Sequence, residues 1–479
     1  MNKFFLDQHG CAKNQVDGEI LITRLLDKGF VCAETPEEAD VILINTCGFI
    51  ESAKEESLES VFAAKNEFPD KKIILCGCLA ERYAENFSTE LANEVDAILG
   101  NGNLTLLDTI IDELFDEKLV ENQVENQAVN QIEKNPIIKK APQIGVCSQE
   151  RKHLLGFTGS AFVKITEGCN NCCSFCAIPL IRGKLRSRTE DKILSEIKSL
   201  LAQGIFEINL IGQDLAAFGR DGVPVGKSNH PSYFEGKTPL ASLLEKISLL
   251  EGDFWIRLLY IHPDHFPFDI LPIIKKDSRI LPYFDVPFQS GSSEVLATMN
   301  RNGTQESYAD LVTKIRSELD SSSIRTTFLC GFPGETDKNA KETENFLVDV
   351  EPDWSGCFSY SREEDTPAYN MKNQVSSKKA EKRAEVLNQL QSKITESRLK
   401  QHIGKTYKIL IEEIIDDEEN DLGIALGRAW FQAPEVDGAS IVTYELDDKS
   451  ALNSIKPGKV ITAKVVGVTG VDINTVFLK

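Results

Sequence analysis

Residues 169 to 176 read Cys-Asn-Asn-Cys-Cys-Ser-Phe-Cys, and this segment decides most about the 479-residue chain. Three of its thiolates, those of Cys169, Cys173 and Cys176, can converge from one short loop. Cysteine thiolates are the usual ligands of iron–sulfur clusters. Three ligands on a four-iron cube leave one iron open, so the segment predicts a cluster that can bind a further molecule.

The spacing leaves two points open. Cys172 offers a second register, Cys169-Cys172-Cys176, but the first register places Phe175 directly before the last ligand, and Cys172 is then a spare thiol. A structural zinc site is the other explanation, although such sites prefer paired CxxC segments and four ligands. In the preferred interpretation, the open iron chelates the amino and carboxylate groups of S-adenosylmethionine.

A second set of three cysteines is spread along the first part of the chain. Cys11, Cys47 and Cys78 each follow a short apolar run that predicts a strand. Ligands of open parallel sheets bind outside the carboxyl ends of the strands, so these thiols are expected to meet in one crevice and hold a second cluster. Chance placement of small buried cysteines is the alternative. Cys76 is the rival of Cys78, but it continues an apolar strand and is assigned to packing.

The pattern of apolar runs and turns predicts an α/β fold in four parts. These are a doubly wound parallel-sheet domain over residues 1–118, a linker over 119–154, a partial βα barrel over 155–400 and a small all-β barrel over 401–479. The linker is predicted because Asn and Gln replace core residues in the run ENQVENQAVNQ, which suggests a disordered or inserted segment.

The chain is strongly acidic, with a formal net charge of −21. Proteins that grip nucleic acids usually show a basic footprint, whereas an acidic surface suits a basic partner or serves solubility alone. Residues 402–479 carry 13 acidic and 8 basic side chains. The sequence contains neither a membrane-length apolar run nor a secretion signal, so a cytoplasmic protein is expected. In a reducing cytosol its cysteines are thiols or metal ligands.

Two turns at predicted strand ends are expected to face the cofactor. Gly331, Gly334 and Glu335 belong to the segment Gly-Phe-Pro-Gly-Glu-Thr, whose glycines allow close approach of the backbone to a ligand. Gln213 and its neighbour Asp214 end another strand and could reach the cofactor, although surface capping explains them equally well.

The remaining polar and cysteine residues give weaker signals. A basic run beside the cysteine loop fits either a contact with the cofactor's carboxylate or the substrate, or a solvated surface; it comprises Arg182, Lys184, Arg186 and Arg188. The six histidines show no metal or triad pattern, and no role is assigned to them. Four further cysteines are expected to be structural: Cys32, Cys147, Cys330 and Cys357.

These features together resemble the methylthiotransferase family of radical S-adenosylmethionine enzymes along nearly the whole chain. The cysteines of the family's N-terminal cluster domain match Cys11, Cys47 and Cys78, and those of its radical core match Cys169, Cys173 and Cys176. The C-terminal part corresponds to the family's TRAM barrel. Within the family, residues 45–57 (NTCGFIESAKEES) and 427–438 (GRAWFQAPEVDG) are similar to the branch that modifies a ribosomal protein.

The resemblance implies two [4Fe–4S] clusters and S-adenosylmethionine as cofactors. It further implies methylthiolation of an aspartate β-carbon in ribosomal protein S12 of the small subunit, and an electron donor such as flavodoxin or ferredoxin. No membrane contact and no strong tRNA binding are expected. Two alternatives stay open: a tRNA adenosine methylthiotransferase, which should have a basic barrel, and a non-catalytic zinc-binding ribosome assembly factor, which should bind zinc.

Overall fold

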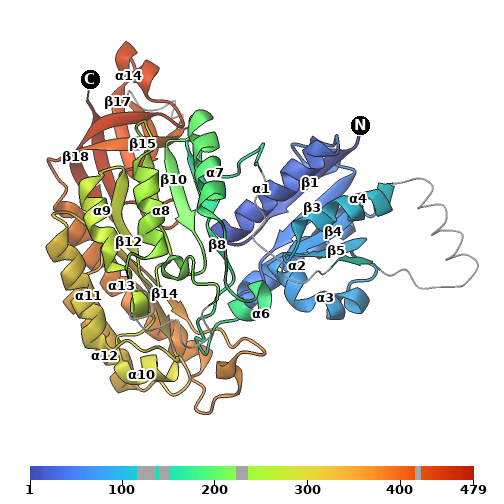
Figure 1. Cartoon of the computed structure of the whole chain (residues 1–479), viewed down its shortest axis with the longest axis horizontal. Helices are drawn as coiled ribbons and strands as arrows, with labels where there is room; N and C mark the ends of the chain where they lie inside the picture. The colour runs from blue at the N-terminus through green and yellow to red at the C-terminus, as the bar shows by residue number, and fades with distance from the viewer. Residues whose placement is uncertain (116–135, 140–149, 223–235, 416–421, 479) are drawn as a thin grey trace, which may run out of the picture.

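The computed structural model describes residues 1–115, 136–139, 150–222, 236–415 and 422–478, and the chain forms three parts (Figure 1). An N-terminal domain and a larger core each contain a six-stranded sheet, and the C-terminal part is a closed barrel. All strand pairs within the two six-stranded sheets are parallel. The predicted fold class is therefore confirmed.

The N-terminal sheet has the strand order β2-β1-β3-β4-β5-β6. Its strands are β1 (Lys3–Gln8), β2 (Val31–Cys32), β3 (Val41–Thr46), β4 (Lys72–Gly77), β5 (Ala97–Gly100) and β6 (Ile137–Lys139). Apolar side chains alternate between two faces along each strand. One face packs on α1 (Ala12–Asp27) and α4 (Leu107–Phe115), and the other on α2 (Glu51–Glu67) and α3 (Cys78–Glu90). The domain is thus doubly wound, and its strand order reverses between β1 and β3.

Two strands of this sheet depart from the prediction. The two-residue strand β2 is exposed and offers no apolar run that sequence reasoning could detect. Strand β6 lies inside the segment expected to be a linker, and it pairs with β5 as an edge strand. That segment therefore also completes the sheet. The whole Asn/Gln-rich run, together with Cys147, lies outside the described residues.

The core sheet has the order β14-β13-β12-β11-β10-β7, so its strands follow one another in chain order. They are β7 (Ser160–Lys164), β10 (Glu207–Ile211), β11 (Trp255–Leu258), β12 (Ile280–Asp285), β13 (Ser323–Cys330) and β14 (Trp354–Ser359). One face is covered by α7 (Glu190–Ala202), α8 (Pro239–Ser248), α9 (Leu271–Lys276), α11 (Gln305–Glu318), α12 (Asp337–Val350) and α13 (Ser377–Lys400). Shorter elements are β8 (Thr166–Glu167), β9 (Arg186–Ser187), α6 (Ile178–Arg182) and α10 (Ser293–Thr298). This open parallel sheet with outer helices is the predicted partial barrel.

The C-terminal barrel packs against the core sheet near the amino ends of the core strands. Its strands are β15 (Thr406–Ile415), β16 (Leu422–Arg428), β17 (Ser440–Glu445), β18 (Val460–Thr469) and β19 (Asp472–Phe477), with α14 (Lys449–Ser454) between β17 and β18. Trp354 of β14 donates from its indole nitrogen to the carbonyl of Phe431 at 2.7 Å. One apolar cluster runs through the N-terminal domain, the core and the barrel, so the three parts share buried surface.

A buried ion-pair set fixes the barrel on the core. Arg428 of β16 lies 2.5 Å from the carboxylate of Glu207 on β10, and Arg257 of β11 lies 2.8 Å from the same carboxylate. Burial alone would raise the pKa of Glu207, but the two guanidinium groups outweigh it and lower the pKa to about 2. Among the described helices, none combines the length and apolar character that a membrane crossing needs.

Candidate functional site

The N-terminal cysteine set, Cys11, Cys47 and Cys78, lies at the carboxyl ends of neighbouring strands. Cys11 follows β1, Cys47 follows β3, and Cys78 begins α3 after β4. The strand order reverses between β1 and β3, which is where open α/β sheets bind ligands. Gly10 has φ +88°, and a Cβ at this residue would lie 3.2 Å from the Cβ of Cys47. The loop after β1 therefore passes directly against the cysteine after β3.

The thiols of this set share one electrostatic environment. Burial, followed by the negative charges of Cys78 and Cys11, raises the pKa of Cys47 to about 12. The protein atoms around Cys11 raise the pKa of its thiol although the side chain is solvent-accessible. The positive charges of Lys13 and Arg182 more than offset this effect and leave the pKa of Cys11 below its usual value. Because metal binding requires thiolates, nearby cations favour a loaded site.

Cys76 is close to Cys78 in sequence but lies in a different place. It is fully buried within β4, and its Sγ is 3.4 Å from the carbonyl oxygen of Ile44 on β3. Its side chain packs among apolar residues between the sheet and α1. The sulfur of Cys78 instead accepts a hydrogen bond from Arg182 of α6 at 3.1 Å. The geometry thus supports packing for Cys76 and membership of the set for Cys78.

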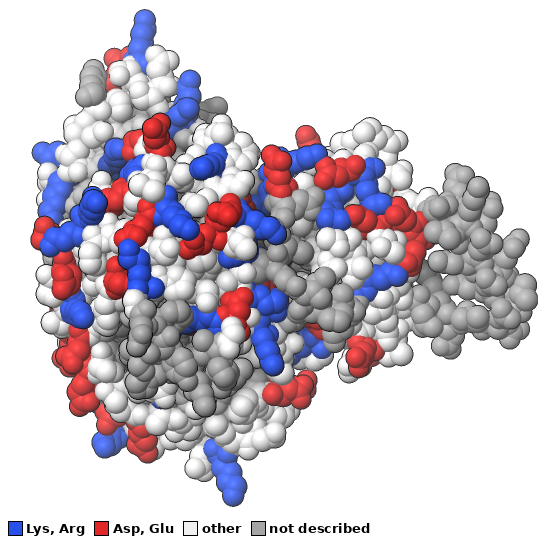
Figure 2. All heavy atoms as spheres, in the orientation of Figure 1, with Lys and Arg blue, Asp and Glu red and all other residues white. Residues whose placement is uncertain are grey.

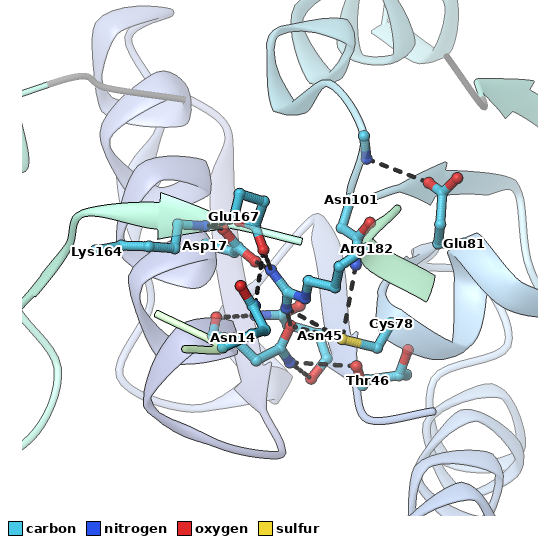
Figure 3. Close-up of polar contacts among 12 residues, drawn as sticks. Asn14, Asp17, Asn45, Thr46, Cys78, Glu81, Asn101, Lys164, Glu167 and Arg182 are labelled. Carbon is cyan, nitrogen blue, oxygen red and sulfur yellow. Dashed lines mark hydrogen bonds and ion pairs between the residues drawn. The ribbon is translucent and has the colours of Figure 1, made fainter. Parts of the chain in front are cut away.

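A buried ion network joins the N-terminal set to the core (Figure 3). Arg182 lies 2.7 Å from the carboxylate of Asp17 on α1 and 3.1 Å from that of Glu167 on β8. Lys164 of β7 lies 2.5 Å from each of the same two carboxylates. All four side chains are at most 7% exposed. The network therefore spans the interface between two domains and reaches the sulfur of Cys78.

The rest of the basic run has other roles. Arg188 is buried and pairs with Glu196 of α7. Arg186 donates to the backbone carbonyls of Arg182 and Lys184, at 3.2 and 2.9 Å. Lys184 itself is exposed. The two explanations that the sequence allowed for this run thus do not cover Arg182 and Arg188, which are buried in ion pairs.

The core cysteine set, Cys169, Cys173 and Cys176, lies on the loop between β8 and α6. The backbone N–H of Cys176 donates to the carbonyl of Cys173 at 3.1 Å, which makes the loop turn tightly. Burial, followed by the charge of Cys173, raises the pKa of Cys176 to about 12. Burial also raises the pKa of Cys169, and the charges of Cys176 and Cys173 contribute. Cys172 is exposed, so the arrangement favours the register with Cys173.

Two histidines beside the core set are residues that sequence reasoning left without a role. His265 Nε2 lies 2.6 Å from the carboxylate of Asp214, and His262 stacks on His265 with ring centroids 4.8 Å apart. His262 Nε2 lies 4.0 Å from the sulfur of Cys173. Burial, together with the charges of Arg301 and His265, lowers the pKa of His262 to about 3. Their spacing directly after a predicted strand is the signal that could have found them.

Gln213 follows the carboxyl end of β10 and joins the ion network of Arg182 and Glu167. Its side-chain nitrogen donates to the carboxylate of Glu167 at 3.0 Å. Its buried Oε1 has no hydrogen-bond partner within the part of the chain that the structure describes. An orphaned buried oxygen is costly unless something else satisfies it, so Gln213 fits a contact with a bound ligand.

Contacts with other residues of the protein fix the segment that contains Gly331, Gly334 and Glu335. Gly331 N–H donates to the carboxylate of Glu335 at 3.1 Å, and Glu335 pairs with Arg383 of α13 at 2.7 Å. Gly331 has φ +79°, and a Cβ there would lie 2.2 Å from the Cβ of Ala380. Helix packing therefore already requires this glycine. The expectation that these three residues contact the cofactor stays a prediction.

Each cysteine set provides three thiolates. Three thiolates suit a four-iron cluster in which one iron is left for another ligand. Within the described ranges, no three His, Cys, Asp or Glu side chains lie close enough together to hold one metal ion. The ligands of a four-iron cluster bind different irons and lie further apart than the ligands of a single ion.

Comparison with known families divides the chain in the same order as the structure does. Residues 3–100 match the Uncharacterized protein family UPF0004, residues 163–347 the Radical SAM superfamily and residues 403–477 the TRAM domain. The Ribosomal protein uS12 methylthiotransferase RimO of Treponema denticola is 48% identical over 98% of this chain and 100% of its own length. The chain belongs to the uS12 methylthiotransferase family. Proteins of the same name from Clostridioides difficile and Aquifex aeolicus are each 37% identical, over 91% and 97% of this chain and 91% and 94% of their own.

Membership of the uS12 methylthiotransferase family fixes the enzyme class. This chain is a radical S-adenosylmethionine methylthiotransferase, and a [4Fe–4S] cluster and S-adenosylmethionine are its cofactors. The predicted class is confirmed. Among solved structures, the radical S-adenosylmethionine methyltransferase TsrM of Kitasatospora setae superposes with a TM-score of 0.52 at 14% identity, covering 77% of this chain and 75% of its own. That likeness shows a shared fold.

Proposed function

We propose that this member of the uS12 methylthiotransferase family inserts a methylthio group at the β-carbon of an aspartate in ribosomal protein uS12. The names of its relatives support the substrate protein. The observation that supports the proposal is the packing of α6, which directly follows the core cysteine loop, against Cys78: Arg182 donates to its sulfur, and Ala177 and Ile181 cluster with it. Sulfur insertion needs a source of radicals and a source of sulfur close together.

The two sets have different roles in this proposal. The core set holds the radical cluster and leaves one iron for S-adenosylmethionine, and the N-terminal set holds a second [4Fe–4S] cluster, which supplies the sulfur. S-adenosylmethionine held at the radical cluster would supply the radical that takes a hydrogen atom from the carbon, and a second S-adenosylmethionine would supply the methyl group of the product. An unactivated C–H bond has no acidic proton, so no protein residue is assigned as a base.

The protein's own side chains position these groups and keep water away. The network of Arg182, Asp17, Glu167 and Lys164 holds α1 and the N-terminal set on the core. Gln213 connects to this network through Glu167, and its buried Oε1, which has no partner among the described residues, is the atom that would contact the ligand. A small electron-transfer protein such as flavodoxin or ferredoxin reduces the radical cluster from outside.

The charge of the barrel favours a protein substrate over tRNA. Residues 402–479 carry 13 acidic and 8 basic side chains. On the face shown in Figure 2, Lys and Arg intermingle with Asp and Glu. A barrel that gripped tRNA would gain affinity from clustered cations, whereas an acidic barrel attracts the basic surface of a ribosomal protein. We therefore propose weak tRNA binding.

The proposal is tested by incubating the reconstituted enzyme, without oxygen, with S-adenosylmethionine, a reductant and either uS12 or bulk tRNA. We expect a mass gain of one methylthio group on uS12, which fragmentation places on an aspartate, and an unmodified tRNA fraction. Iron and sulfide analysis should give about eight irons per chain, as two four-iron clusters require. Methylthiolated adenosine with unmodified uS12 would reject the substrate. About four irons would reject the second cluster.

A further inference from the structure

Arg182 makes a hydrogen bond to the sulfur of Cys78 in addition to the ion pairs that hold the two domains together. Its Nη2 donates to the sulfur of Cys78 at 3.1 Å, while Nη1 binds the carboxylates of Asp17 and Glu167 (Figure 3). The guanidinium is 2% exposed. Arg182 belongs to the core and Cys78 to the N-terminal domain, so this hydrogen bond crosses the domain interface.

The two carboxylates and a second cation hold the guanidinium in this orientation. Asp17 and Glu167 accept from one end of the fork, and Lys164 pairs with both of them at 2.5 Å. The other end of the fork is thereby directed at the thiol of Cys78. Arginine suits this position because its planar fork serves three acceptors in one rigid geometry, whereas a lysine ammonium is a point charge.

A charged donor on a cluster ligand changes the energetics of the cluster. Hydrogen bonds to the ligand sulfurs are among the factors that set the reduction potential of iron–sulfur clusters. Reduction adds an electron, so a buried positive charge and a hydrogen bond at the sulfur stabilise the reduced state more than the oxidised state. In a buried site this effect is screened little by solvent.

We propose that Arg182 is a positioning residue that raises the reduction potential of the N-terminal cluster through its hydrogen bond to Cys78. The inference rests on the proposed second cluster. Because Arg182 comes from the core, the N-terminal cluster has this tuned potential only when its domain is docked on the core.

The same network connects Cys78 to Gln213 of the core. Glu167 accepts from Arg182 at 3.1 Å and from Gln213 at 3.0 Å. Gln213 lies at the end of β10 with an unpaired buried oxygen. A ligand that binds to Gln213 can therefore shift Glu167, and with it the guanidinium that contacts Cys78.

A matched control separates this role from simple domain packing. Arg151 is also a buried arginine at the interface, with a 1% exposed side chain that pairs with Glu19 of α1 and with Glu196 of α7 at 2.7 Å. Its hydrogen bonds go to carboxylates and not to a cysteine. Arg151→Met should weaken the same interface without touching a cluster ligand.

The experiment uses the full chain in which Cys169, Cys173 and Cys176 are replaced by Ala, so that the N-terminal cluster is the remaining cluster. Arg182→Met, Arg182→Lys and Arg151→Met are each added to this parent. The midpoint potential of the cluster is measured by redox titration followed with electron paramagnetic resonance, and thermal unfolding is recorded in parallel. We expect Arg182→Met to shift the midpoint to more negative potential, Arg182→Lys to shift it less, and Arg151→Met to leave it at the parent value.

The outcomes distinguish the two proposals. A parent without about four irons would refute the second cluster of the proposed function, and this inference with it. A parent with the cluster whose potential is the same in all Arg182 variants would refute this inference alone. An equal shift in Arg151→Met and Arg182→Met would also refute it, because domain docking would then explain the effect. If Arg182→Met does not fold, the shift in Arg182→Lys decides.

Discussion

The two cysteine sets of this enzyme are built in opposite ways. The core set comes from eight consecutive residues on one loop, and a tight backbone turn between Cys173 and Cys176 brings its members together. The N-terminal set comes from three strand ends, and its members meet because the sheet places β1, β3 and β4 side by side. The core set can therefore form locally, whereas the N-terminal set exists only in the folded domain.

The two sets also differ in whether the side chains around them come from their own domain or from the other domain. The core set lies beside groups of its own domain, such as His262, which is 4.0 Å from Cys173. The N-terminal set receives a hydrogen bond to Cys78 from Arg182 of the other domain. We therefore expect the chemistry of the core set to survive changes at the domain interface, and the chemistry of the N-terminal set to depend on them.

The largest effect is expected from the core set. Replacing Cys169, Cys173 or Cys176 by Ala removes one of the three ligands of the radical cluster, so formation of 5′-deoxyadenosine should fall to background. The measurement is chromatography of the products after reduction of the reconstituted enzyme. Retained cleavage in Cys173→Ala, with loss in Cys172→Ala, would show that the other register is correct.

Replacing Cys11, Cys47 or Cys78 by Ala should separate the two sets. S-adenosylmethionine cleavage should persist because the core set is intact, while methylthiolation of uS12 is lost and iron falls to about four per chain. Both products are measured in one reaction by mass spectrometry. Full methylthiolation in Cys78→Ala, combined with its loss in Cys76→Ala, would reverse the assignment of these two cysteines.

A variant at the barrel interface tests whether the loss of a buried ionic contact away from the cysteine sets affects the clusters. Glu207→Gln removes a carboxylate whose pKa is lowered to about 2, so the free energy of unfolding at neutral pH should fall by roughly 3 kcal/mol. A lowered pKa gives stability that is complete above the unfolded pKa of about 4.3 and is lost as the pH falls toward 2. The measurement is denaturant unfolding of the cluster-free protein at several pH values. The difference in free energy of unfolding between wild type and variant should decrease as the pH falls from about 4.3 toward 2.

The same variant provides a control for the comparison of the two sets. Glu207 contacts neither cysteine set, so reconstituted Glu207→Gln should keep its full iron content at neutral pH. Loss of iron from the N-terminal set in this variant would mean that this site depends on the stability of the whole protein, and not on its own interface with the core.

The smallest effects are expected at the two rival cysteines. Cys76→Ala removes a buried sulfur that packs in the sheet, which should lower the free energy of unfolding by about 1 kcal/mol without changing iron content. Cys172→Ala changes an exposed side chain and should alter neither quantity. Iron analysis and denaturant unfolding of both variants check this, and a loss of about four irons in either would contradict the assignment.

Sequence reasoning found most of the helices, strands and loops that have a recognisable local sequence pattern. The apolar run of β3 and the spacing of the cysteine loop are readable because a buried parallel strand and a local ligand loop each leave a contiguous signal. Strand β6 is not readable in this way, because three residues after an Asn/Gln-rich run become a strand only through the neighbouring edge of β5. The position of His262 after a predicted strand is a weak signal, and only the tertiary structure brings its ring within 4.0 Å of the sulfur of Cys173.

The sequence by itself determined the fold class and the six cysteines that we propose as ligands, because ligand spacing and hydrophobic period are local properties of the chain. Its resemblance to a known family indicated the enzyme class. The tertiary structure decided what surrounds these cysteines. It separated Cys76, which still lies in β4, from Cys78, which begins α3 after Gly77 with φ +94°. It also converted Arg182 from one member of a basic run into a buried donor to a thiol. Contacts between residues 104 positions apart arise from the packing of two domains, and no local pattern encodes them.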